Sequence, residues 1–467
     1  MQITFHGAAG CVTGSKHLIT LQNGDSILLD CGLFQGMGEA TFNLNANFGF
    51  DAKTITAVVL SHAHIDHTGL LPKLIKEGFT GKIYCTPATK DLANILLQDS
   101  ANIQEMDVKF ANKRRAFYKL PLYQPLYTQQ DATDTATHFV THNYDTPFAV
   151  TESVQCTFTD TGHIVGSAAI NLTIADGDVT KQLTFSGDVG RYTDAILKSP
   201  QPFAQANYII MESTYGDTLH DQHTDTPDTL LQWINNICIA KKGKLLIPAF
   251  SVGRTQELLY ALNTLENQGK LPKLSYIVDS PLSEDATTVL KAYPQYFNNT
   301  IQQVIQQGDK DPFMFAGLQY TQTVEDSKML NYNNEPCVII SSSGMADAGR
   351  IKHHISNNIE NSNNGILMSG YCEPNSLGGR LKTKPDSVTI FGQSHQVNAQ
   401  IGELRSMSAH GDYNDLCNWL SCQNAAAVEH LFLVHGEPKV QQHLQQTLIG
   451  KGFKNITIPT LHQRVII

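Results

Sequence analysis

A histidine-rich segment, His62-Ala63-His64-Ile65-Asp66-His67, directly follows the apolar run Ala57–Leu60, which has the length and the β-branched content of a buried strand. Residues two apart on an extended chain point to the same side. His62 and His64 are therefore predicted to face one way, with Asp66 and His67 where the next helix begins. A chain with this segment must bring a strand end and a helix start together around four polar side chains. The alternative is a polar loop that only caps a helix.

Histidine and aspartate in this spacing are typical of a metal site, because neutral imidazole and carboxylate suit Zn²⁺. One tetrahedral zinc cannot take all four side chains and still leave a position for water. The segment therefore predicts two metal ions.

The opening of the chain is predicted to be a β-meander. Strands at His17–Leu21 and Ser26–Asp30 flank Asn23-Gly24, a hairpin pair in which both residues need positive φ. The polar stretch Thr128–Thr137 is predicted to be a surface loop.

Beyond Thr54, short β-branched runs alternate with helical patterns, which predicts an α/β fold. The clearest pair is a strand at Lys244–Ile247 followed by a helix at Arg254–Leu262. Further buried strands are predicted at Gln182–Phe185, Tyr208–Met211, Tyr276–Val278, Cys337–Ile340, Gly365–Met368 and His430–Val434.

Composition narrows the class of protein. At about 150 residues per domain, 467 residues correspond to roughly three units. Apolar residues make up 41% and charged residues 16% of the chain, which is enough for a globular core. The net charge of −10 lacks the basic surplus of a typical nucleic-acid binder. A polyanion would therefore have to be held locally or through bound cations.

The nine cysteines include no Cys-x-x-Cys pair, and nothing near Met1 resembles a signal peptide, which together favour a reducing cytoplasm. No run approaches the roughly 18 consecutive apolar residues that a bilayer requires, so no membrane segment is predicted.

Other ionisable side chains also lie just after a predicted strand, as the histidine-rich segment does. Four of them follow predicted strands: Asp30, His163, Asp188 and His435. Taken singly, each is explained as a turn residue or a satisfied core group. Their joint occurrence with the histidine-rich segment points to a shared site. Three further histidines have no identifiable partner and are assigned no function: His353, His354 and His395.

The order of these residues resembles a known family. Asp30, His62-x-His64-x-Asp66-His67, His163 and Asp188 resemble the metallo-β-lactamase superfamily. Three further motifs resemble those of its β-CASP nucleases: Glu212 in Met-Glu-Ser-Thr-Tyr-Gly, His410 in Ser-Ala-His-Gly-Asp-Tyr, and His435 in Val-His-Gly-Glu. The resemblance spans nearly the whole chain and is strongest to the nuclease subunit of the pre-mRNA 3′-end cleavage factor and its prokaryotic homologues. Residues 370–378 match the family's Gly-Thr-Leu-Gly loop only loosely.

The resemblance implies two zinc ions per chain. The implied ligands fall into two sets that share a bridging Asp188: His62, His64 and His163 for one ion, and Asp66, His67 and His435 for the other. Asp30 would orient a ligand without touching metal. Two zinc ions about 3.5–4 Å apart hold a bridging hydroxide that can attack a phosphodiester.

A phosphodiester also needs its leaving oxygen protonated, and His410 is predicted to be that general acid. Glu212, at the end of the predicted strand Tyr208–Met211, would hydrogen-bond the imidazole and raise its pKa. Asp66 is the third residue predicted to be catalytic, through the ion that it holds. Without the metal motif, Glu212 would be a surface carboxylate and His410 a histidine at a helix start.

The segment between Glu212 and His410 repeats a strand, a loop and a helix three times. Loops of Ser and Gly that enter a helix present backbone N–H groups to an anion, and an arginine adds a guanidinium fork. The candidate contacts to substrate phosphate are Arg254, Ser342, Ser343 and Gly344. Such turns are also ordinary N-caps.

The implied architecture is a metallo-β-lactamase αβ/βα sandwich built from residues 1–208 and 396–467, with a Rossmann-like β-CASP domain inserted at 209–395. The implied function is a zinc-dependent phosphodiesterase that cleaves single-stranded RNA to 5′-phosphate and 3′-hydroxyl products. RNA is favoured over DNA because the RNA-processing branch has histidine at the position of His435.

Other classes stay open at this stage: a small-molecule hydrolase such as a thioesterase or lactonase, a DNA nuclease, and a noncatalytic partner subunit. The inserted domain argues against the first, and the filled ligand positions argue against the last. The sequence leaves open whether cutting is endonucleolytic or 5′-exonucleolytic, and it leaves open the oligomeric state, a homodimer included.

Overall fold

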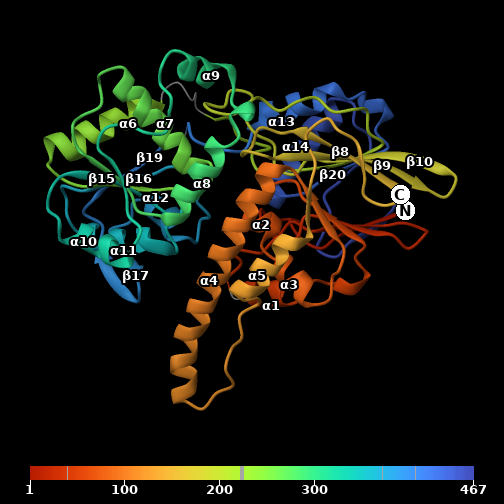
Figure 1. Ribbon diagram of the computed structural model, residues 1–467, viewed down its shortest axis with the longest axis horizontal. Coiled ribbons are helices and arrows are strands. Elements are labelled where there is room, and N and C mark those ends of the chain that lie inside the picture. Colours follow the sequence, from red (N-terminus) through yellow and green to blue (C-terminus); the bar gives the residue numbers. More distant parts are fainter. Residues whose placement is uncertain (39, 221–225, 371, 405) are drawn as a thin grey trace. The chain divides into compact units, whose positions relative to one another are not determined.

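The computed structural model describes residues 1–38, 40–220, 226–370, 372–404 and 406–467. The chain divides into two compact units, which Figure 1 colours along the sequence. The first unit comprises Met1–Tyr192, Ser199–Leu219 and His410–Ile467. The second unit comprises Thr193–Lys198 and His220–Ala409.

Two seven-stranded sheets make up the centre of the first unit. One has the strand order β22-β1-β2-β3-β4-β5-β6. Its strands are β1 (Gln2–Phe5), β2 (His17–Thr20), β3 (Ser26–Leu29), β4 (Ala57–Val59), β5 (Lys82–Cys85), β6 (Phe139–Thr141) and β22 (Arg464–Ile466). Strands β3 to β6 run parallel, and the strands before them pair antiparallel.

The other sheet has the order β21-β20-β11-β10-β9-β8-β7. Its strands are β7 (Phe148–Ala149), β8 (Val154–Asp160), β9 (Ala168–Asp176), β10 (Val179–Phe185), β11 (Tyr208–Met211), β20 (His430–Leu433) and β21 (Ile456–Thr457). Strands β10, β11, β20 and β21 are parallel neighbours.

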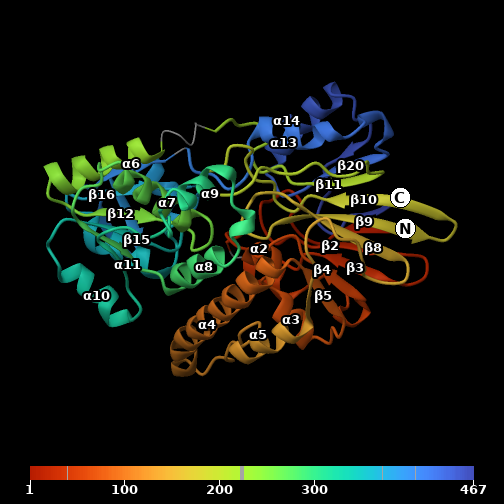
Figure 2. The same ribbon diagram turned by 45° about the horizontal axis from the view of Figure 1, so that its top comes forward.

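Helices cover the outer faces of both sheets, so the first unit has four layers (Figure 2). Its helices are α1 (Ala40–Ala46), α2 (Ile65–Thr68), α3 (Leu71–Lys76), α4 (Pro87–Phe117), α5 (Gln129–Thr135), α13 (Tyr413–Trp419) and α14 (Pro438–Gly450). Strand β11 shows how the sequence produces these layers. Tyr208 and Ile210 pack between the two sheets, whereas Ile209 and Met211 pack with residues of α13 and α14. This period of two is the pattern of a strand buried on both faces.

The second unit contains a six-stranded sheet in the order β14-β13-β15-β12-β16-β19, in which every pairing is parallel. Its strands are β12 (Leu245–Pro248), β13 (Ser275–Val278), β14 (Leu318–Tyr320), β15 (Cys337–Ser341), β16 (Gly365–Met368) and β19 (Gln400–Glu403). Its α-helices are α6 (Thr226–Ile234), α7 (Arg254–Asn267), α8 (Pro281–Lys291), α9 (Asn299–Gln306), α10 (Val324–Tyr332), α11 (Gly349–Asn358) and α12 (Leu377–Lys382). A separate hairpin joins β17 (Ser387–Ile390) to β18 (Gln393–Gln396).

The predicted α/β class is confirmed, and the predicted strands at Tyr208–Met211 and Gly365–Met368 have the observed bounds. Two local predictions are wrong. β2 and β3 pair antiparallel as the meander requires, but of the pair Asn23-Gly24 only Gly24 has positive φ, and five residues rather than the predicted four separate the strands. Thr128–Thr137 is mostly helix α5, because the Thr128 hydroxyl and the Asp131 carboxylate form a capping box. No helix of the described residues is long and apolar enough to cross a membrane.

A buried polar cluster in the second unit supplies the partner that His354 lacked in the sequence. Asp279 follows β13 and is fully buried. One of its oxygens lies 2.5 Å from His354 Nε2 and accepts from the Ser327 hydroxyl, and the other accepts from Thr321 and from Arg350 Nη1 at 2.7 Å. Although burial favours the neutral acid, hydrogen bonds from His354 and its neighbours hold the pKa of Asp279 below its usual value.

We expect Asp279→Asn to lower the free energy of unfolding by ~3 kcal/mol at pH 7, because the substitution removes one partner from a buried charged cluster. A carboxylate with a depressed folded pKa stabilises the fold above the unfolded pKa of about 3.9 and loses that contribution as the pH falls through the folded pKa. In urea titrations, the difference between wild type and variant should therefore narrow below about pH 4. Equal stability of the two proteins at pH 7 would contradict this account.

Candidate metal centre

Polar side chains of the first unit lie where its parallel strands end. Asp30 follows β3 directly, and His62 comes three residues after β4. In the other sheet, Glu212 directly follows β11, while Asp188 and His435 come shortly after β10 and β20. The carboxyl ends of parallel neighbours meet at one sheet edge, so residues far apart in the sequence gather there. The histidine-rich segment lies beyond β4, in the loop and in α2, rather than on an extended strand end.

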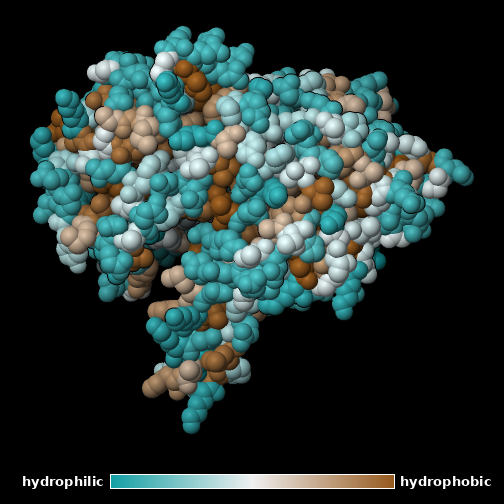
Figure 3. Space-filling model, in the orientation of Figure 1, coloured by the Kyte–Doolittle hydropathy of each residue, from teal (hydrophilic) through white to brown (hydrophobic). Residues whose placement is uncertain are grey.

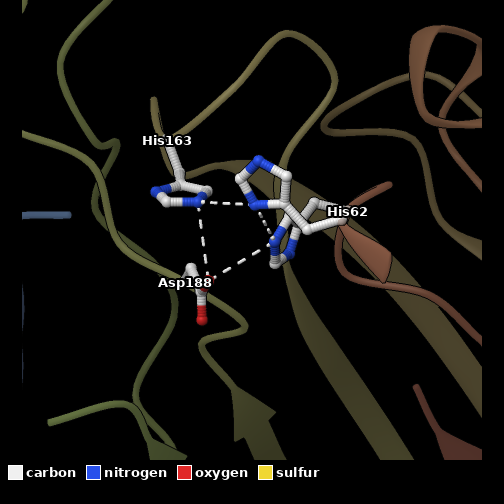
Figure 4. Close-up of side chains that lie close together, drawn as sticks. His62, His163 and Asp188 are labelled. Carbon is white, nitrogen blue, oxygen red and sulfur yellow. Dashed lines mark hydrogen bonds and ion pairs between the residues drawn. The ribbon is translucent and has the colours of Figure 1, made fainter. Parts of the chain in front are cut away.

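Three histidines and one aspartate form the first ligand group. His62 Nε2 and His163 Nε2 lie 3.1 and 3.2 Å from His64 Nδ1. The same two nitrogens lie 3.4 and 3.5 Å from Asp188 Oδ2. Figure 4 shows His62 and His163 pointing toward the Asp188 carboxylate. These four donor atoms are close enough together to hold one metal ion.

Asp66, His67 and His435 form the second ligand group. His435 Nε2 lies 3.3 Å from both His67 Nε2 and Asp66 Oδ2. The other oxygen of Asp188, Oδ1, lies 3.4 Å from His67 Nε2 and 3.7 Å from His435 Nδ1. Asp188 therefore presents one carboxylate oxygen to each group.

Asp30 contacts the second group through His67. Its Oδ2 lies 2.7 Å from His67 Nδ1 and accepts from the Ser61 hydroxyl at 2.8 Å, and its Oδ1 accepts from Ser61 N–H at 2.8 Å. On the other side of the group, the Thr214 hydroxyl lies 3.1 Å from His435 Nδ1. Ser61 and Thr214 were not predicted from the sequence, although each is adjacent or nearly adjacent to a predicted residue, His62 or Glu212.

The protonation of His62, His64 and Asp66 fits a bound cation. Burial lowers the pKa of His62 well below its usual value, and burial lowers that of His64 to about 4, so both rings are neutral at pH 7. Burial opposes ionisation of Asp66, but nearby histidines lower its pKa to about 2. Metal ions bind neutral imidazole and ionised carboxylate.

Asp188 gives a second sign of fit. Its Oδ1 atom is buried and accepts no hydrogen bond from the described residues. A buried carboxylate oxygen without a hydrogen bond is costly unless a cation balances it. The donor set of imidazoles and carboxylates thus suits a divalent metal.

Glu212 and His410 meet next to the first ligand group. His410 Nδ1 lies 3.2 Å from both Glu212 oxygens and 3.9 Å from Asp188 Oδ2. Backbone N–H groups of Val189 and Thr214 donate to Glu212 at 2.6 and 3.3 Å, which holds the carboxylate in place. The loop that carries His410 is tied to the Asp188 loop, because Gly411 N–H donates to the Val189 carbonyl at 2.7 Å.

The charge of this pair favours a protonated ring. Burial by itself lowers the pKa of His410, but Glu212 and then Asp188 outweigh it and raise the pKa to about 9. Glu212 is fully buried, whereas the His410 side chain is 20% exposed. The arrangement can therefore hold a proton on a ring that remains reachable.

The candidate phosphate contacts lie in the second unit, at the carboxyl ends of its strands. The hydroxyls of Ser251 and Ser280 lie 2.9 and 2.8 Å from that of Ser342, so three strand ends meet there. Arg254 is buried and its Nη1 pairs with Glu257 at 2.5 Å, while its Nε makes no hydrogen bond to the described residues. Ser343 lies 3.4 Å from the Ala348 carbonyl, and Gly344 packs against Phe250. Of the divergent loop 370–378, residue 371 lies outside the described residues.

Three protein-family descriptions match the chain. The metallo-beta-lactamase superfamily matches residues 10–233, the Beta-Casp domain matches residues 255–381, and the Zn-dependent metallo-hydrolase RNA specificity domain matches residues 394–459. The matched ranges together include all the predicted site residues except Arg254, which directly precedes the second range.

Relatives of known name agree with these matches. Ribonuclease TTHA0252 of Thermus thermophilus is 34% identical over 455 residues, which cover 97% of both chains. Transcription termination factor FttA of Methanosarcina mazei is 28% identical and covers 95% of this chain and 68% of its own length. A solved structure of a protein of unknown function from Enterococcus faecalis shares the fold, with a TM-score of 0.54 at 12% identity over 100% of this chain and 99% of its own. The chain therefore belongs to the β-CASP metal-dependent ribonucleases of the metallo-β-lactamase superfamily.

Proposed function

We propose that the protein hydrolyses single-stranded RNA with two zinc ions, one in each ligand group, and that Asp188 is shared between them. The position of Asp188 carries this proposal, because its two oxygens lie in different groups of donor atoms. The imidazole-rich donor set favours zinc over magnesium or calcium, which prefer oxygen ligands.

Two bound zinc ions would supply a hydroxide nucleophile from water and compensate charge on the attacked phosphate. Side chains of the protein orient the ligands and supply the proton for the leaving group. Asp30 fixes the ring of His67 through Nδ1, and Ser61 fixes Asp30. His410 directs Nδ1 to Glu212, so that Nε2 carries the proton for the 3′-oxygen that leaves.

The second unit would grip the RNA backbone. The hydroxyls of Ser251, Ser280 and Ser342 and the loop Ser343-Gly344 offer donors to a phosphate, as does the unbonded Nε of Arg254. Because Glu257 already pairs with the guanidinium, Arg254 contributes less net charge than a free arginine would.

Zinc content tests the two-ion proposal. Gently purified protein should contain close to two zinc ions per chain by elemental analysis, because seven side chains of suitable ligand type form two groups. Removal of the zinc with a chelator should abolish RNA cleavage, and added Zn²⁺ should restore the cleavage. One ion or none per active chain would contradict the proposal.

The ends of the cleaved RNA test the reaction itself. Attack by a water-derived nucleophile opposite the 3′-oxygen leaves a 5′-phosphate and a 3′-hydroxyl and does not use the 2′-hydroxyl. An RNA with a single 2′-O-methyl group at the cleaved linkage should therefore still be cut, with the unmodified RNA as control. A 2′,3′-cyclic phosphate, or full protection by the methyl group with binding preserved, would overturn the mechanism.

A further inference from the structure

The far end of helix α4 carries an apolar stripe that nothing in the described chain covers. Over its first half, α4 is anchored by buried residues that include Leu92 and Leu96. Thr89 at its start donates to the Gly166 carbonyl, three residues from His163. The C-terminal part of the helix extends past the other elements of the first unit (Figures 1 and 2). At 1.5 Å per residue, its tip lies roughly 40 Å along the axis from Thr89.

The exposed stripe continues the buried one. Ile103, Met106, Phe110 and Phe117 recur at intervals of three, four and seven, which places them on one helix face. Phe110 is 79% and Phe117 is 80% exposed, and Tyr118 is exposed beside them. The rings of Phe117 and Tyr118 pack edge to face, with centroids 5.1 Å apart. Large aromatic side chains this exposed usually mark a contact surface.

The same tip is strongly basic in a chain of net charge −10. Residues 108–119 contain five basic residues and no acidic one: Lys109, Lys113, Arg114, Arg115 and Lys119. Of these, Arg115 stacks on Tyr123 with its guanidinium 3.9 Å from the ring centroid. Within the part of the chain that the structure describes, none of the five forms an ion pair with a carboxylate.

Basic and aromatic side chains alternate on this face rather than separate. Lys113 and Arg114 lie between Phe110 and Phe117 on the same side of the helix. Figure 3 shows apolar and hydrophilic side chains interleaved at this projecting end. A helix that lies on a lipid surface has a continuous apolar face with its basic residues on the opposite side. Interleaved aromatic rings and cations are the pattern that binds single-stranded nucleic acid, by stacking on bases and by contact with phosphates.

The segment that follows α4 is hydrogen-bonded to the tip of the helix. The Asn112 side chain donates to the Tyr123 carbonyl and accepts from Tyr123 N–H, both at 2.9 Å. This pair fixes the segment that follows α4 against the helix, so the aromatic side chains are presented from an ordered scaffold. Two copies docking through this same face would bring their five cations together, which disfavours self-association there.

We propose that the tip of α4, residues 106–119, is a second RNA-binding surface of the first unit, in which Phe110, Phe117 and Tyr118 stack on bases while Lys109, Lys113 and Arg114 contact phosphates. The inference rests on single-stranded RNA being the substrate. The surface would hold RNA that extends beyond the linkage being cut.

The aromatic variant F110A/F117A/Y118A tests stacking. With a 30-nucleotide single-stranded RNA, its KM should rise roughly 10- to 100-fold, since stacking on an aromatic side chain contributes strongly for each base. Hydrolysis of the small phosphodiester bis(p-nitrophenyl) phosphate should be unchanged, because this probe reaches only the metal centre. The exposed Tyr332 gives the matched control, and Tyr332→Ala should leave both activities unchanged.

The charge variant K109Q/K113Q/R114Q tests the phosphate contacts. The plot of log binding constant against log salt concentration for the same RNA has a negative slope. Its magnitude should decrease by about 2, at roughly 0.7 for each phosphate that a cation no longer neutralises. Lys454→Gln, an exposed lysine elsewhere, is the control. Circular dichroism of each variant checks that α4 remains folded.

The outcomes separate this surface from the metal centre. If the wild-type protein does not hydrolyse bis(p-nitrophenyl) phosphate, the result counts against the proposed function. RNA binding by the tip can still be measured in that case. Unchanged RNA affinity and salt slope in both variants would overturn the α4 proposal. The α4 proposal would also be overturned if the variants differed from the wild type only in oligomeric state, measured by sedimentation, or only in binding to anionic phospholipid vesicles.

Discussion

Asp188→Asn is expected to lower kcat/KM for RNA cleavage at least roughly 1,000-fold, since a bound metal ion contributes several kcal/mol to such reactions and each 1.36 kcal/mol is a factor of ten. The amide keeps the size of the side chain but removes the negative charge and one good ligand atom. Because Asp188 faces both ligand groups, zinc content should fall at both sites. Elemental analysis and steady-state kinetics on the same preparation measure both effects.

A matched series makes this test specific. Asp66 belongs only to the second group, so Asp66→Asn should remove about one ion, keep the other and still abolish cleavage. Asp178 is exposed in the turn between β9 and β10, and Asp178→Asn should change neither zinc content nor rate. If Asp188→Asn retained two ions and wild-type turnover, the shared position of Asp188 would have no function.

His410→Ala is expected to slow cleavage by roughly 100- to 10,000-fold while zinc content and RNA affinity stay at wild-type levels. The reason is the contact between His410 Nδ1 and Glu212, which equips the ring to deliver a proton rather than to bind metal. Single-turnover kinetics with saturating enzyme measure the chemical step, and elemental analysis measures zinc. The exposed His443 gives the control variant, His443→Ala.

A modified substrate distinguishes an acid from a structural residue. With sulfur in place of the 3′-oxygen at the cleaved linkage, the leaving group departs as a thiolate without a proton. The defect of His410→Ala should then shrink by at least about tenfold. An equal defect on both substrates, or loss of zinc from the variant, would remove His410 from the role of general acid.

The residues that the sequence proposed for the candidate site lie close together because their positions follow from simple rules. Asp30, Glu212 and His435 come directly or shortly after apolar strand patterns, and parallel strands bring such ends together. The seven predicted ligands lie in two groups within the first unit. Their roles remain predictions that the variants above will test.

What the sequence did not predict depends on tertiary contacts. His354 and Asp279 are 75 residues apart, and neither carries a local signal for the other. Helix α4 runs for 31 residues although its second half buries little, so its length does not follow from packing against the rest of the fold. Thr128–Thr137 is mostly polar, and its helix depends on the capping box and on packing against α4.

The most direct test of the account is anomalous X-ray scattering at the zinc absorption edge from crystals of the zinc-loaded protein. Two peaks about 3.5–4 Å apart are expected, with the Asp188 carboxylate between them. His62, His64 and His163 should surround one peak, and Asp66, His67 and His435 the other. A single peak, or two peaks of which only one is bound by Asp188, would contradict the shared two-metal centre.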